Sequence, residues 1–432
     1  MSLQSEPTPL KSHHSKPINL ALRTVPLAFL LLTPVSIANE DDLEKRVSEL
    51  EATIEVLLEE AERDQMPDLF TPLGKSQHGL GPAASKIYAK DEGVSIGGYG
   101  EFLLTDPAGG DRQFDAYRSI LYAGFKFDEH WLFNSEIEIE HGSTGVVEED
   151  DDGHTESVGS VSLEFGYVDY LHNDSFGARA GLLLVPVGIT NELHEPITFL
   201  PANRPQTEKR IIPTTWRENG AGVFGSTESG FDWKAFVVNG LDGNSFSSSG
   251  LRGGRQKGAK ANAEDFGVAC RLDYSGTPGL TVGASIYHGD SGQSGPQDLT
   301  TTIAEVHAIY ETGPWSMRAL AAQATVDDVA AFNGGDAGVA EGMHGHYVEV
   351  GYDLFSELVP VEGQSLSPFV RYEGLDTQSE LPSGQTKASD QDDTIMTVGL
   401  AYQPIDNIII KMDYEDWDEG TDRFNLLLGY VF

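Results

Sequence analysis

The sequence predicts an all-β protein: a 16-stranded antiparallel transmembrane β-barrel preceded by a short N-terminal coiled-coil helix. Three features of the 432 residues favour this fold class. Apolar and polar residues alternate with a period of two in segments of about ten residues, the length of a strand tilted across a bilayer. The connections between these segments alternate between short and long. The chain also ends on an aromatic residue, Phe432, after apolar residues at every second position.

The N-terminus, residues 1–38, is predicted to be a signal peptide. Three basic residues precede the apolar stretch 25–38, which contains the small residues Ser36 and Ala38 at its end. A basic segment, a short apolar run and a small-residue cleavage site are the parts of a secretion signal. We therefore expect export from the cytoplasm, and the alternative is an amphipathic N-terminus.

Residues 39–65 are predicted to form a coiled-coil helix, because apolar residues there are spaced alternately by four and three. About three heptads are too few for a lone helix to be stable in water, so we expect self-association. The alternative is an amphipathic helix packed on the main body. Residues 66–93 contain several Pro and Gly residues and are predicted to be a linker. The heptad positions are Leu43, Val47, Leu50, Ile54 and Leu57.

Residues 94–432 are predicted to form the barrel, and residues 131–141 show its pattern most clearly. In a membrane barrel the apolar side chains of a strand face lipid and the polar ones face the lumen. Short turns are expected on the periplasmic side and long loops on the outer side. In this segment Trp131, Phe133, Ile137 and Ile139 alternate with Asn134, Glu136, Glu138 and Glu140.

Composition excludes several classes of protein. The formal net charge of −40 argues against a nucleic-acid binder, whose binding face is basic. A single cysteine, Cys270, excludes an intramolecular disulfide and a thiolate zinc cluster. No hydrolase, zinc-protease or phosphate-loop motif is present, so we expect no enzyme, no catalytic residues, no metal and no cofactor. We interpret the 39% hydrophobic share as the sign of a barrel without a packed interior.

Several motifs of the barrel segment resemble those of proteobacterial porins related to the phosphate-selective porin O and P family. The resemblance covers residues 94–432 and implies a homotrimeric, 16-stranded channel in the outer membrane of a Gram-negative bacterium. Porins of that family line their constriction with Arg and Lys, whereas the predicted lumen faces here contain more Glu and Asp. The motifs are VSIGGYGEF (94–102), GLLLVPVG (181–188), NELHEP (191–196), NRP (203–205), IIPTTWRENG (211–220), NGLD (239–242) and GLRGGRQK (250–257).

Two long loops, 189–217 and 241–264, concentrate basic residues in an acidic chain. The first follows the fifth predicted strand and is expected to fold inward and narrow the pore. Arginine forks suit phosphate or carboxylate, so our hypothesis is an anion-attracting zone. The alternative is that the second loop binds lipopolysaccharide phosphates or a neighbouring subunit. The candidate constriction residues are Arg118, Lys126, Glu136, Glu138, Glu140, Glu192, Glu195, Arg204, Lys209, Arg210, Arg217, Arg252, Arg255, Lys257 and Lys260.

The predicted function is that of an outer-membrane porin through which small hydrophilic solutes diffuse passively, with phosphate-like anion selectivity as a hypothesis. The alternatives are a structural or adhesive barrel anchored to the cell wall, and a barrel enzyme. The expected partners are further copies in a homotrimer, lipopolysaccharide and outer-membrane lipid, the transported solutes and the barrel-assembly machinery, but no nucleic acid.

Overall fold

The computed structural model describes residues 73–143, 146–149, 155–173, 175–295, 298–332, 338–388 and 390–432. All of them belong to one compact unit, Pro67–Phe432. The predicted signal peptide and coiled-coil helix lie outside the described residues. No helix within the described residues is long and apolar enough to cross a membrane.

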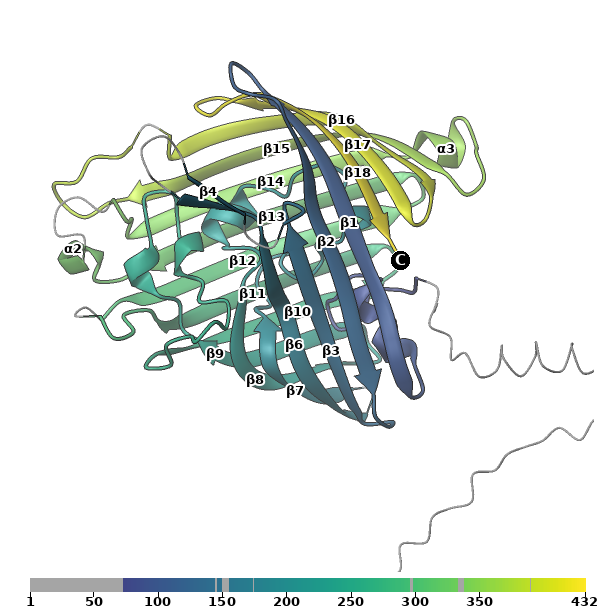
Figure 1. Cartoon of the computed structure of the whole chain (residues 1–432), viewed down its shortest axis with the longest axis horizontal. Coiled ribbons are helices and arrows are strands. Elements are labelled where there is room, and N and C mark those ends of the chain that lie inside the picture. Colours follow the sequence, from purple (N-terminus) through teal and green to yellow (C-terminus); the bar gives the residue numbers. More distant parts are fainter. Residues whose placement is uncertain are drawn as a thin grey trace, which may run out of the picture. The chain divides into compact units, whose positions relative to one another are not determined.

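Sixteen strands form a closed antiparallel barrel, which confirms the predicted fold class for this part of the chain (Figure 1). Each strand pairs with its neighbours along the chain, except where the β4–β5 hairpin intervenes between β3 and β6. The barrel strands are β1 (Gly93–Pro107), β2 (Gln113–Lys126), β3 (Trp131–Glu140), β6 (Ser160–Asn173), β7 (Phe176–Leu184), β8 (Arg217–Ser226), β9 (Phe231–Asn239), β10 (Phe266–Thr277), β11 (Leu280–Asp290), β12 (Thr300–Thr312), β13 (Trp315–Val326), β14 (Gly342–Tyr352), β15 (Ser365–Glu380), β16 (Asp392–Ile405), β17 (Ile408–Trp417) and β18 (Arg423–Val431).

The remaining elements are short and lie in the connections, except η2, which precedes β1. β4 and β5 form a separate two-stranded sheet. Their bounds, with those of the helices, are β4 (Val146–Glu149), β5 (Thr155–Val158), η2 (Ala84–Ala89), η3 (Pro196–Thr198), η4 (Thr207–Ile211), η5 (Gly243–Ser245), η6 (Arg252–Gly254), α2 (Val329–Phe332) and α3 (Leu354–Glu357).

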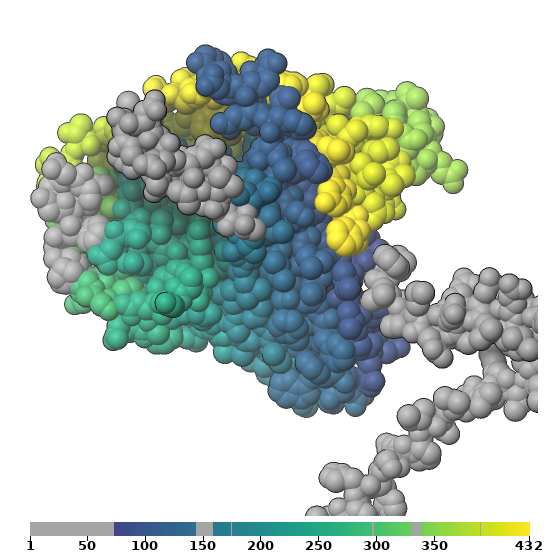
Figure 2. Space-filling model, viewed as in Figure 1, coloured from purple at the N-terminus to yellow at the C-terminus, as the bar shows by residue number. Residues whose placement is uncertain are grey.

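The barrel closes where the first strand meets the last. β1 pairs with β18 from Tyr99 opposite Val431 to Pro107 opposite Arg423. Beyond that ladder, the backbone of Phe432 exchanges two hydrogen bonds with Gly98, of 2.9 and 3.0 Å. Figure 2 shows the last strands (yellow) directly beside the first strands (blue). Because the sheet is closed, each of the sixteen barrel strands is paired on both sides.

The period of two seen in the sequence separates the two faces of the wall. In β3, Ile137 is 37% exposed on the outer face, whereas Glu136 on the inner face is completely buried. The same holds in the last strand, where Leu428 is exposed and Leu427 is buried. An apolar outer band and a polar inner face are what a barrel surrounded by lipid requires.

The connections differ in length between the two ends of the barrel. At one end are short turns such as 227–230 and 313–314, with the longer connection 353–364 as an exception. At the other end are long loops such as 185–216 and 240–265. By the rule for bacterial barrels, we expect the short-turn end to face the periplasm.

The interior is packed, so the expectation of a barrel without a packed interior was wrong. Ile189, Ile211 and Trp216 have no exposed surface, and they belong to one buried cluster with the inward-facing Phe165 and Tyr347. Apolar side chains from loop 185–216 and from residues 73–90 enter the barrel and cover its polar inner wall. An alternating pattern shows which strand residues point inward, but it does not show which other segments cover them.

Part of the segment predicted to be a linker lies against this wall. We call residues 73–90 the strap. Its helix η2 packs against β1, β2 and β3. Leu80 and Ile87 of the strap are each 1% exposed. The strap is therefore a component of the barrel interior, and this part of the chain is not a free linker.

Candidate functional site

The main candidate site is formed by residues 185–216, which we call the inner loop. It leaves the wall after β7, where Pro186 cannot donate to a strand ladder. Gly188 follows with a φ of +80°, a conformation that L side chains rarely adopt. A Cβ at Gly188 would also lie 2.7 Å from a carboxylate oxygen of Glu208. Proline and glycine together turn the chain from the wall into the lumen.

The inner loop crosses the lumen and is bonded to the opposite wall. The backbone N–H of Ala202 donates to Asp413 at 2.6 Å, and Lys411 donates to the carbonyl of Pro201 at 3.0 Å. Arg371 donates to the loop carbonyl of Asn203, also at 3.0 Å. Buried polar groups of the loop and of β15 and β17 are thereby paired, which fixes the course of the loop.

A cavity of about 110 Å³ lies between the inner loop, the loop that contains η6, and the wall formed by β1, β2, β3 and β18. We call it the cationic cavity, because its lining has five basic side chains and two acidic ones. The basic residues are Arg118, Arg204, Lys209, Arg252 and Arg423, and the acidic ones are Glu101 and Glu140.

Two of the five cations are neutralised by carboxylates. Arg118 Nε lies 2.8 Å from Glu101 Oε2. Arg423 Nη2 lies 2.6 Å from Glu415 Oε2. These pairs belong to the wall, since all four residues are on strands.

The other three cations, Arg204, Lys209 and Arg252, form no salt bridge with any described residue. Arg252 donates to the carbonyl of Thr214, and the Nη2 of Arg204 is buried without a hydrogen-bond partner in the described part of the chain. The pKa of Lys209 is lowered to about 8. Burial is the largest cause, and repulsion from the neighbouring guanidinium group of Arg252 is the next. The cavity therefore has an excess of positive charge that an anion would neutralise.

The acidic candidates of β3 lie on the inner wall but are covered. Glu136 lies 3.2 Å from the Nε2 of His194 in the inner loop. Glu138 is 3% exposed and lies 3.9 Å from Arg118. Glu140 accepts a hydrogen bond from Ser160 and lines the cationic cavity. Of these three carboxylates, only Glu140 borders the cavity.

The remaining basic candidates lie outside the lining of the cationic cavity. Arg217 pairs with Glu164 at 2.6 Å, and Lys126 donates to the carbonyl of Lys90 at 2.6 Å. Lys257 and Lys260 are exposed, Arg210 donates to the carbonyl of Ser249 at 3.4 Å, and Arg255 donates to the carbonyl of Thr214 at 2.7 Å.

Sequence reasoning did not select Arg423, Glu101 or Tyr117 of the cavity lining. Arg423 begins the final strand on the same face as the buried residues Asn425 and Leu427. The alternation in that strand therefore contains the signal that places Arg423 on the inner face.

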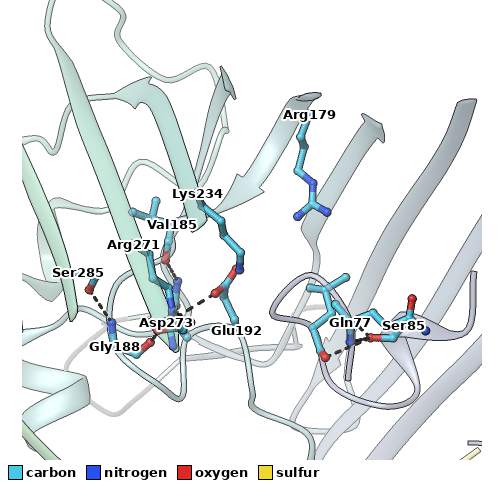
Figure 3. A network of polar contacts seen from close by, with 12 residues as sticks. Gln77, Ser85, Arg179, Val185, Gly188, Glu192, Lys234, Arg271, Asp273 and Ser285 are labelled. Carbon is cyan, nitrogen blue, oxygen red and sulfur yellow. Dashed lines mark hydrogen bonds and ion pairs between the residues drawn. The ribbon is translucent and has the colours of Figure 1, made fainter. Parts of the chain in front are cut away.

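A second polar network joins the inner loop to the wall of β9, β10 and β11 (Figure 3). Glu192 of the loop lies 2.5 Å from Lys234 and 3.8 Å from Arg271. Arg271 also pairs with Asp273 at 2.7 Å, and Ser285 accepts a hydrogen bond of 3.4 Å from the N–H of Gly188. Glu192 thus holds the loop in place. Among the described residues, no group of three or more His, Cys, Asp or Glu is arranged to hold a metal ion.

The sequence is similar to that of one protein with no described function. Over 376 residues the chain is 37% identical to an uncharacterized protein of Aquifex aeolicus (strain VF5), and the match covers 83% of each chain. No family model matches the sequence.

Similar solved structures are outer-membrane porins. OmpF of Salmonella typhi, in a complex with daunomycin, has a TM-score of 0.54 and 15% identity, over 80% of this chain and 99% of that chain. OmpT of Vibrio cholerae, an outer membrane protein in its trimer form, has a TM-score of 0.48 and 12% identity, over 79% of this chain and 100% of that chain. The likeness to OmpF shows a shared barrel fold.

Proposed function

The chain belongs to the same family as the Aquifex aeolicus protein, and from the barrel fold that it shares with OmpF we propose that it is an outer-membrane porin. Small hydrophilic solutes diffuse through its lumen, and the cationic cavity makes the passage favourable for anions. The closed 16-stranded barrel with an apolar outer band supports the channel. In a bilayer, strands can pair all their backbone polar groups only when the sheet is closed into a barrel.

The observation that supports anion preference is the grouping of Arg204, Lys209 and Arg252 around one cavity without carboxylate partners among the described residues. Rings of basic side chains at a constriction favour anions in channels. Guanidinium groups match the oxygen pairs of carboxylate and phosphate. The preferred solutes are therefore small anions of these two kinds.

Reversal potentials in planar bilayers under a KCl gradient test this proposal. We expect wild-type protein to pass chloride in preference to potassium, and R204Q/K209Q/R252Q to lose that preference. The matched control is R112Q/K257Q/K260Q, which removes three exposed basic side chains outside the cavity and keeps the wild-type ratio. An unchanged ratio in the first variant would contradict anion selection by the cavity.

We also propose that the protein is a homotrimer in the outer membrane, assembled by the barrel-assembly machinery and surrounded by lipopolysaccharide. The aromatic C-terminal strand and the resemblance to porins support this. Cross-linking of the purified protein in detergent tests the subunit number, and a monomer would contradict it. Liposome swelling separates the channel from the alternatives, since an anchoring barrel passes no solute.

A further inference from the structure

The strap enters the lumen at the short-turn end of the barrel. Four of its apolar residues, Leu80, Ala83, Ala84 and Ile87, are between 1% and 3% exposed. They belong to the same buried cluster as the inward-facing aromatic residues of β1, β2 and β6. The strap therefore occupies space inside the barrel that solute would otherwise fill.

The wall is shaped to receive the strap. A Cβ at Gly97 of β1 would lie 3.0 Å from the carbonyl oxygen of Ala83. A Cβ at Gly124 of β2 would lie 3.1 Å from Cγ1 of Ile87. Both distances are tighter than ordinary contacts, so the absence of side chains at these two wall positions lets the strap lie close to the sheet.

Hydrogen bonds join the strap to the wall. Tyr88 donates to Asp169 at 2.8 Å and accepts from Arg179 at 2.7 Å. Asn134 of β3 donates to the carbonyl of Ala84 at 3.0 Å. Because these groups are mostly buried, each bond holds the strap against the sheet without competition from bulk water.

The strap is also bonded to the inner loop through Glu195, which is 1% exposed. Its carboxylate accepts from the N–H of Ala83 at 2.9 Å and from that of Ala84 at 3.0 Å. Glu195 lies nine residues before Arg204 in the same loop. The loop that presents the cationic cavity is thus bonded directly to the strap.

Between the strap and the wall of β8, β9, β10 and β11 lies a second cavity, of about 480 Å³, which we call the strap cavity. Residues 76–79 of the strap form one side of it. The charged wall residues that line it are two cations and two acids, namely Lys234, Arg271, Asp232 and Asp273. Burial lowers the pKa of His78 to about 3, so this strap residue is neutral at pH 7.

We propose that the strap narrows the periplasmic mouth to a second constriction, and that Glu195 couples it to the inner loop. This inference rests on the proposed channel function. The balanced charge of the strap cavity gives it little preference for either sign of solute, in contrast to the cationic cavity. The pore then has two constrictions in series, of which the cationic cavity alone selects by charge.

Cysteine labelling tests whether the strap lines the path of solutes. In a C270A background, Q77C places a thiol at an exposed strap position that lines the strap cavity. Modification with a neutral polyethylene-glycol maleimide is expected to lower single-channel conductance at least twofold and to leave the ion preference unchanged. The control is E129C in the turn before β3, 86% exposed, whose modification should leave conductance unchanged.

The outcomes separate the strap from the channel function. If unlabelled protein conducts and full labelling of Q77C leaves conductance unchanged, the strap is not a constriction. A Q77C thiol that stays unlabelled also overturns the inference, because a residue on the solute path must be reachable from water. If no variant conducts, with folding checked by heat-modifiable mobility, the proposed channel itself is wrong and the strap inference falls with it.

Coupling through Glu195 is tested separately. E195A removes both acceptor oxygens and is expected to increase conductance and to allow trypsin to cleave at Lys86, which is 6% exposed in the intact protein. E195Q keeps one acceptor oxygen and should restore most of the protection. If E195A has wild-type conductance and resists trypsin at Lys86, Glu195 does not hold the strap.

Discussion

Lys209 provides a test of the cationic cavity that needs no change in the folded structure. Its pKa is lowered to about 8, by burial and then by neighbouring guanidinium groups. An ordinary lysine has a pKa of about 10.4. Raising the pH from 6 to 9 therefore removes most of the charge of Lys209, while Arg252, whose pKa burial lowers to about 10, keeps most of its charge. We expect the anion preference of the channel to fall across this range, with a midpoint near pH 8.

The size of the effect follows from the cavity. A sphere of 110 Å³ has a radius of about 3 Å, and a lining nitrogen is about one contact distance further out, so a central anion lies about 6 Å from it. A unit charge at that distance contributes about 0.7 kcal/mol at a dielectric constant of 80 and about 2.8 kcal/mol at 20. The ratio of anion to cation permeability should therefore fall by at least about threefold.

The assay is the reversal potential of wild-type and K209Q channels under one KCl gradient at several pH values. The wild type should show the step, and K209Q should have the lower ratio throughout and no step near pH 8. Tyr117, Glu101 and Glu140 also face the cavity. Because these groups are present in both channels, a step that is absent from K209Q belongs to Lys209. A step of equal size in K209Q, or none in the wild type, would refute the reasoning.

Three further predictions concern the stability of the barrel. Stability is measured as the temperature at which the heat-modifiable mobility of the folded barrel is lost. Gly188→Ala should destabilise the barrel by about 1–3 kcal/mol, because it combines a positive φ with a close contact. The control is Gly384→Ala, where φ is +92° and a Cβ would have nothing within 4 Å. It measures the strain of the positive φ alone and should destabilise the barrel less than Gly188→Ala. Lys411→Met removes the donor to the carbonyl of Pro201. It should lower stability by about 1–3 kcal/mol and raise conductance. Wild-type stability together with wild-type conductance would contradict the role given to this bond. Val306→Arg on the outer face of β12, 59% exposed, should cost about 2–4 kcal/mol near the membrane midplane, whereas Val306→Leu should be neutral.

The alternation in the sequence was enough to predict the barrel, because strand residues report their face directly. Glu136 and Ile137 lie on the inner and outer faces as the pattern indicated. Two of the basic residues selected from separate loops, Arg204 and Arg252, line one cavity. Their charge contrasts with the acidic chain, so composition alone made them visible.

The contents of the lumen were not predictable in the same way. Glu138 points inward, but its burial depends on segments far away in the sequence, which leave no periodic signal in β3. The Pro and Gly residues before Leu80 indicate a break in regular structure without indicating where the chain goes. The position of the strap depends on small wall residues such as Gly124, whose role appears only when the partner segment is in place.

The seam between β1 and β18 also constrains the order of assembly. Since the last residue, Phe432, is bonded to Gly98, the ring of strands cannot be completed until the whole chain is available. The strap packs on β1, β2 and β3, the strands that follow it directly in the chain. It is therefore able to dock on an open, curved sheet early, and the later strands then enclose it. A strap that arrived after completion would have to enter through the short-turn mouth. Docking of the strap before closure therefore makes the seam the final step.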